Sequence, residues 1–158
     1  MRKASAKEIY ASCLILLIGI VYLAAQTDAL FSIGSTTVKG DMIQLSRNEI
    51  LSHLRTVLTI ILCFSGGILL LKIKTTGWII SQSILLLLLT IASGIFISNI
   101  TGLNTSGIVL AAGMILLLSA ILFLLQKQTR QKFTITKKSY MSVMILFAIL
   151  AVFYFLLQ

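Results

Sequence analysis

Residues 46–72 have the sequence SRNEILSHLRTVLTIILCFSGGILLLK, and this stretch decides the fold of the chain. Ser46 and Glu49 have the spacing of a capping box, which predicts that a helix begins near residue 47. Apolar residues then continue to Leu71 with no proline between them. A helix of about 25 residues, at ~1.5 Å per residue, is longer than the ~30 Å hydrocarbon core of a bilayer. The stretch therefore predicts a transmembrane helix.

The composition of the whole chain agrees with this prediction. Of its 158 residues, 58% are hydrophobic and 11% are charged, and the mean hydropathy is +1.07. A soluble domain carries about 25% charged residues, so this chain has too few polar groups to cover a surface that faces water. Its apolar residues form long runs instead of alternating with polar ones, which favours helices over an outer-membrane barrel.

Five apolar stretches are long enough to cross a bilayer, and they predict an all-α bundle of five transmembrane helices in a single domain. The predicted spans are residues 10–26, 47–71, 78–98, 107–126 and 140–157. The first stretch also has the layout of a secretory signal peptide, and its cleavage would leave four helices. Because Leu23 stands where an A-x-A cleavage site needs a small residue, we favour an uncleaved first helix.

The segments between the spans predict three kinds of connection. Residues 27–45 predict the longest polar loop, and residues 72–77 predict a tight turn that ends at Gly77. Trp78 follows this turn and is expected in the aromatic belt at a membrane interface. Residues 127–139 predict a basic loop.

The charges of these segments predict how the chain is threaded through the membrane. The N-terminus, residues 72–77 and residues 127–139 together contain ten basic residues and a single acid, Glu8. Residues 28–55 contain three basic and three acidic residues. The positive-inside rule therefore predicts a plasma membrane or bacterial inner membrane protein with its N-terminus in the cytoplasm and its C-terminus outside.

Small and polar residues form one stripe along the helix predicted for residues 47–71. The stripe consists of Asn48, Ser52, Arg55, Thr59, Cys63 and Gly66. A charged residue inside a membrane segment is a candidate functional residue, so Arg55 is a candidate anion contact, with Asn48, Ser52 and Thr59 beside it on a ligand site or pathway. The alternative is that small residues pack against other helices and that Arg55 extends to the lipid headgroups.

His53 is the only histidine, and Glu49 lies one turn before it on the same helix face. It is a weaker pathway candidate, because a polar residue near the start of a membrane helix needs no special role. A metal site needs three or four ligands, so we predict no metal site and no cofactor. The two cysteines, Cys13 and Cys63, lie in separate apolar runs and predict no disulfide.

Small residues elsewhere predict where helices approach closely. Gly94 and Ser98 end one predicted helix, and Gly107 and Ala111 begin the next, in the spacing that favours close contact between membrane helices. We therefore expect a tight antiparallel hairpin at these residues. Gly66 and Gly67 are expected to serve a similar packing role in the helix predicted for residues 47–71.

The basic loop contains five cations and no acid: Lys127, Arg130, Lys132, Lys137 and Lys138. Such a loop can fix the orientation of the chain, bind anionic lipid, or bind an acidic partner protein. Recognition of nucleic acid is not expected, because the chain has no domain that would position a basic patch against it.

The sequence leaves two functional hypotheses. The first is a non-catalytic accessory or assembly subunit of a larger membrane complex, since the predicted spans contain no acid beyond Glu49 in the first turn of the second span, and the chain has no catalytic motif. The second is a small homo-oligomeric channel or transporter with a polar path along the helix at residues 47–71. The expected partners are the lipid bilayer and either another membrane protein or a second copy of the chain.

Overall fold

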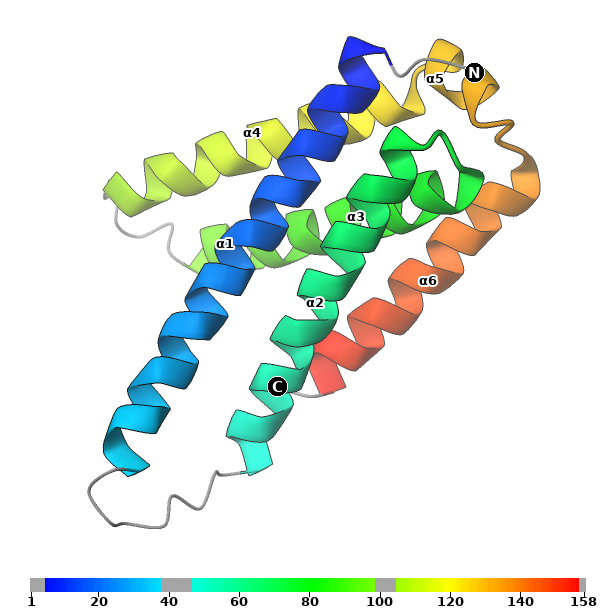
Figure 1. Ribbon diagram of the computed structural model, residues 1–158. Coiled ribbons are helices and arrows are strands. Elements are labelled where there is room, and N and C mark those ends of the chain that lie inside the picture. The colour runs from blue at the N-terminus through cyan, green and yellow to red at the C-terminus, as the bar shows by residue number, and fades with distance from the viewer. Residues whose placement is uncertain (1–4, 38–46, 99–104, 157–158) are drawn as a thin grey trace.

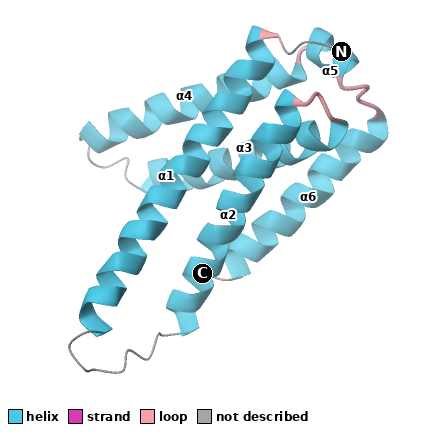
Figure 2. Cartoon of the chain, viewed as in Figure 1, coloured by secondary structure: helices cyan, strands magenta, loops and turns pink. Residues whose placement is uncertain are grey.

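The computed structural model describes residues 5–37, 47–98 and 105–156, and the side chains of residues 5–28, 51–98 and 107–155. The described part of the chain is helical and contains no strand (Figures 1 and 2). Its helices are α1 (Ala6–Thr37), α2 (Arg47–Leu71), α3 (Thr75–Ser98), α4 (Thr105–Leu125), α5 (Lys127–Lys132) and α6 (Lys137–Leu156). All except α5 are long and apolar enough to cross a membrane. The chain is thus an all-α, multi-pass membrane protein, as the sequence predicts.

Helix α3 lies at the centre of the bundle. It packs against α2, α4 and α6, and α1 packs against α2 and α4. In Figure 1, α1 and α2 run side by side, and α3 and α4 form a second pair that crosses them obliquely. The buried side chains of α3 include apolar residues and the polar residues Ser81, Gln82 and Ser83, which places three polar side chains inside the bundle.

Three basic segments gather at one end of the bundle, which we call the basic end (Figure 1). They are the start of α1, the α2–α3 turn and residues 126–139. Contacts join them: Lys132 forms an ion pair with Glu8 at 3.2 Å, and the Thr75 hydroxyl donates to the Phe133 carbonyl at 2.9 Å. The opposite end, which we call the neutral end, holds the first residues of α2 and the last residues of α6. That the basic end faces the cytoplasm stays a prediction.

Trp78 lies in the core of the basic end, so the prediction that it anchors the chain at a lipid interface is wrong. Its side chain is fully buried. Its ring meets the Tyr140 ring edge-on with 5.5 Å between centroids, and its indole nitrogen donates to the Leu124 carbonyl at 3.0 Å. The reason is tertiary, because the end of α4 and the start of α6 cover the first turn of α3.

Gly77 lies inside α3, not in the preceding turn as the sequence predicted. A Cβ atom at this position would lie 2.4 Å from the main-chain carbonyl carbon of Leu69. Glycine is therefore needed where the first turn of α3 crosses the last turn of α2. The turn itself comprises residues 72–74, and Ile73 has a φ of 51°, the left-handed conformation that commonly ends a helix.

Helix α1 continues into the predicted polar loop. It is 32 residues long and ends at Thr37. Residues 27–37 contain no proline, so no residue in this stretch lacks the backbone N–H that a continuing helix needs. Residues 38–46, including Ser46 of the predicted capping box, lie outside the described residues.

The predicted basic loop is largely helical. Residues 127–132 form α5, and α6 begins at Lys137, three residues before the predicted span. Two residues of this segment, Thr129 and Phe133, are buried at 2% and 1% exposure. Burial of Phe133 against the bundle gives the segment a tertiary structure that hydropathy alone does not indicate.

Candidate functional site

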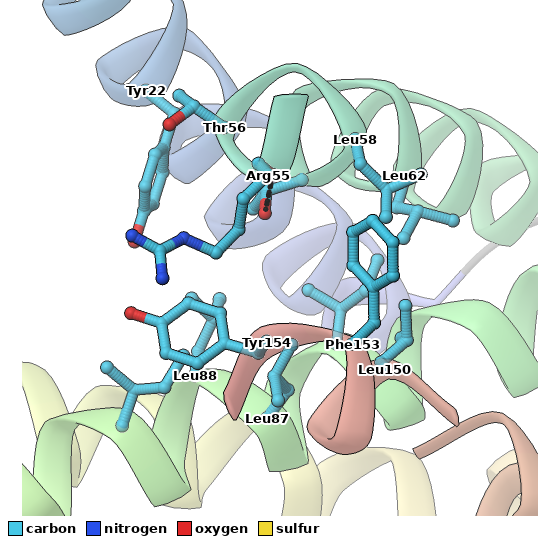
Figure 3. Close-up of a pocket in the computed structure, with 13 residues that line it drawn as sticks. Tyr22, Arg55, Thr56, Leu58, Leu62, Leu87, Leu88, Leu150, Phe153 and Tyr154 are labelled. Atoms are coloured by element: carbon cyan, nitrogen blue, oxygen red, sulfur yellow. Dashed lines mark hydrogen bonds between the residues drawn. The ribbon is translucent and has the colours of Figure 1, made fainter. Parts of the chain in front are cut away.

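A cavity of about 100 Å³ lies toward the neutral end, between α1, α2, α3 and α6 (Figure 3). One part of its wall is polar and carries Tyr22 from α1, Arg55 from α2 and Tyr154 from α6. The rest of the wall is mainly apolar and includes Leu58, Leu62, Ile84, Leu87, Leu88, Ile91, Leu150 and Phe153. The cavity is therefore amphipathic, with a cation at its polar part.

Arg55 provides this cation. It lies eight residues after Arg47, where α2 begins, and hence about 12 Å along the helix. Its guanidinium carbon lies 4.5 Å from the centroid of the Tyr154 ring, an arrangement in which the ring face attracts the cation. Within the described chain, no carboxylate or other acceptor pairs with this guanidinium. No described residue therefore uses its hydrogen-bond donors.

Two tyrosine hydroxyls accompany Arg55. Figure 3 shows the Tyr22 and Tyr154 hydroxyls on the same side of the cavity as the guanidinium. Neither hydroxyl has a hydrogen-bond partner among the described residues. A phenolic hydroxyl can donate one hydrogen bond, so three side chains from three helices offer donors at one place.

The threonines of the cavity do not add to these donors. The Thr56 hydroxyl donates to the Ser52 carbonyl at 3.0 Å, and the Thr59 hydroxyl donates to the Arg55 carbonyl at 2.9 Å. A hydroxyl has one proton, so each is already used within α2. Both threonines line the cavity but contribute acceptor atoms only.

The remaining pathway candidates lie elsewhere. The Ser52 side chain is exposed and does not line the cavity, because the lining arc of α2 begins one turn later, at Arg55. The side chain of Asn48 lies outside the described residues. The structure therefore brings Arg55 and Thr59 together in the cavity and leaves Ser52 outside it.

His53 joins α2 to α1 near the neutral end. Its Nδ1 atom lies 2.6 Å from the Nε2 atom of Gln26, whose side chain is only 9% exposed. A hydrogen bond between helices accounts for the position of this histidine. Its expected neighbour Glu49 has a side chain outside the described part.

Comparison of the chain with protein-family models, curated proteins and solved structures found no match.

The predicted packing residues lie in different environments. Gly66 and Gly67 are buried in α2; a Cβ atom at Gly66 would lie 3.1 Å from the Ser81 hydroxyl, and one at Gly67 would lie 2.7 Å from Leu16. At Gly94, a Cβ atom would meet no described atom within 4 Å. The expected close approach is therefore wrong at Gly94.

The other small residues of the expected hairpin make no tight contact that the structure describes. Ser98 is exposed, and its hydroxyl donates to the Ile95 carbonyl of its own helix. Gly107 and Ala111 are half-buried on α4. Helices α3 and α4 do pack together, but their buried residues concentrate toward the basic end, at Leu117, Ala120 and Leu124.

Tyr22 and Tyr154 are the site residues that the sequence did not indicate. Each lies near an end of a predicted span, where aromatic residues are common, so neither is unusual alone. The predicted threading could have indicated that they lie near Arg55. With five spans, the end of the first span, the start of the second and the end of the last lie at the same face of the membrane. No group of three or more metal-binding side chains occurs among the described residues.

Proposed function

We propose that this protein is a non-catalytic accessory or assembly subunit of a larger membrane complex, which binds its partner through the basic end. The observation that carries the proposal is the tertiary structure of residues 126–139. A basic loop that serves only to orient the chain needs positive charge and no defined structure. This segment is instead attached to α1, α3 and α6.

The attachments are hydrogen bonds and an ion pair. Lys7 donates to the Gln126 side chain, Lys132 pairs with the fully buried Glu8, and Thr75 donates to the Phe133 carbonyl. These contacts hold the ends of α5 against α1 and α3. A short helix held in this way presents its outer side chains in a defined arrangement.

The five cations of this segment divide into two groups. Arg130 and Lys132 are turned toward the bundle: an Arg130 Nη1 donates to the Tyr140 hydroxyl at 3.0 Å, and Lys132 contacts Glu8. Lys127, Lys137 and Lys138 are exposed. We therefore assign the contact with an acidic partner surface to these three lysines, with anionic lipid as the other outcome of the test.

Intact-complex mass spectrometry after gentle extraction tests the proposal. We expect the protein to be recovered with a second polypeptide in fixed ratio, and we expect Lys127→Gln, Lys137→Gln and Lys138→Gln together to reduce this recovery. The matched control is Lys72→Gln with Lys74→Gln, which removes exposed cations of the α2–α3 turn at the same end. Recovery of the protein with lipid alone, as a single type of subunit, would contradict the proposal.

A channel or transporter is the second candidate, because Arg55 and Thr59 line an internal cavity. Against a pathway through one subunit, the basic end is filled by the buried side chains of Leu70, Trp78, Leu124 and Phe133. A pathway would therefore lie between copies of the chain. Anion flux into liposomes that changes with Arg55→Ala would favour this candidate over the first.

A further inference from the structure

A groove of about 350 Å³ lies beside the Arg55 cavity, between α1, α3 and α4. Its lining is apolar apart from Tyr22 and includes Leu14, Leu88, Ile91 and Gly113. Toward the basic end α1 and α4 are joined by Tyr10, which contacts Phe123 and Ser119. Away from these contacts the two helices diverge over α3.

The groove and the Arg55 cavity lie side by side. Tyr22, Leu88 and Ile91 line both, so these three side chains form a shared wall. The cavity offers a cation and two hydroxyls, and the adjoining groove offers apolar side chains. An occupant that matches both must carry a negative charge joined to a hydrocarbon chain.

The direction of the groove agrees with the orientation of a membrane lipid. Leu14 lies eight residues before Tyr22 on α1, and hence about 12 Å nearer the basic end. A lipid in the leaflet of the neutral end has its headgroup at the level of Tyr22 and Arg55. Its chain then points toward the bilayer centre, along the groove.

We propose that Arg55, Tyr22 and Tyr154 bind the phosphate of an anionic phospholipid, one acyl chain of which lies in the groove between α1, α3 and α4. The guanidinium group matches a phosphate with two parallel hydrogen bonds, and the tyrosine hydroxyls add donors. The acyl chain takes the place of the bulk lipid that would otherwise contact this apolar surface. The site lies at the opposite end from the lysines of the proposed partner contact, so the two proposals are independent.

Native mass spectrometry of the purified protein in uncharged detergent tests the site with two probes of equal chain length, a phosphatidylglycerol and a phosphatidylcholine. We expect retention of phosphatidylglycerol to exceed that of phosphatidylcholine about tenfold, as one charge-assisted contact can provide. Arg55→Gln should abolish this preference. Tyr22→Phe with Tyr154→Phe, which keeps both rings, should reduce it while leaving the fold intact.

Two glycines provide a matched pair for the groove. Gly113 lines it and Gly94 does not, and a Cβ atom at either position meets no described atom within 4 Å. Gly113→Leu should therefore fill the groove and lower retention of both lipids, whereas Gly94→Leu should leave retention unchanged. Lys127→Gln, Lys137→Gln and Lys138→Gln together should also leave the preference unchanged.

Three results would overturn the proposal. The first is equal retention of the two lipids by the unaltered protein, and the second is an undiminished preference in both the arginine and the tyrosine variants. The third is full displacement of phosphatidylglycerol by glycerol phosphate at equal concentration, because the site would then select a soluble phosphate compound without a chain.

Discussion

The indole nitrogen of Trp78 donates a hydrogen bond to the main-chain carbonyl of Leu124 across 3.0 Å. This bond joins the first turn of α3 to the last turn of α4. The Tyr140 ring of α6 packs edge-on against the same indole. Three helices therefore meet at one side chain. The basic end is organised around this tryptophan.

Replacement of Trp78 should accordingly destabilise the whole bundle. We expect Trp78→Ala to lower the free energy of unfolding by about 3–5 kcal/mol, the usual cost of removing a large buried ring. Trp78→Phe keeps most of the packing and should cost less, about 1 kcal/mol for the lost hydrogen bond plus the smaller ring. Reversible unfolding in mixed micelles measures both changes. Equal losses in the two variants would assign the effect to the hydrogen bond and not to packing.

Gly77 and Gly94 should respond in opposite ways to a single methyl group. At Gly77 the new Cβ atom would lie 2.4 Å from main-chain carbon, so Gly77→Ala should cost at least about 1–3 kcal/mol through overpacking. Gly94→Ala meets open space and should be neutral or stabilise by up to ~1 kcal/mol through helix propensity. Thermal unfolding of the two variants side by side measures the difference. Similar melting temperatures would contradict the close crossing of α2 and α3.

Glu8 and Lys132 form an ion pair, so substitutions of the two residues should have non-additive effects on the free energy of unfolding. The Glu8 side chain is fully buried and that of Lys132 is 34% exposed. Lys132→Met should therefore destabilise the protein by roughly 1–3 kcal/mol, because it leaves a buried carboxylate without its cation. Adding Glu8→Gln to Lys132→Met should recover part of this loss. Additive effects of the two substitutions in unfolding measurements would argue against the pair.

The hydrogen bond between Gln26 and His53 should contribute less. Side-chain hydrogen bonds between membrane helices average about 0.6 kcal/mol in double-mutant cycles. A cycle of Gln26→Leu and His53→Phe should give a coupling energy of this order. No measurable coupling would mean that α1 and α2 are held at this level by packing alone.

The orientation of the chain is testable with single cysteines placed in a variant that lacks Cys13 and Cys63. We expect Lys74→Cys and Lys138→Cys to react with a membrane-impermeant thiol reagent from the cytoplasmic face, because both side chains are exposed at the basic end. Asp28→Cys should react from the opposite face. Reaction of Lys74→Cys and Lys138→Cys from different faces would contradict the five-span bundle itself.

The sequence alone determined the all-α membrane fold and the number of spans, because a span depends on the length and apolarity of one segment. Its charges also predicted which segments share an end, and contacts such as Glu8–Lys132 place them there. Each of these properties belongs to a single segment, or is a sum of the charges of separate segments. No knowledge of which helix touches which was needed.

Only the tertiary structure decided which side chains meet. Lipid-facing and helix-facing surfaces are equally apolar in a membrane protein, so hydropathy does not distinguish them. Gly94 therefore looked like a packing residue and faces open space, and Trp78 looked like an interfacial anchor and lies in the core. Tyr22 and Tyr154 were not unusual as single residues. Arg55 was a candidate from the sequence, but its neighbours come from α1 and α6. Their positions depend on the crossing of whole helices.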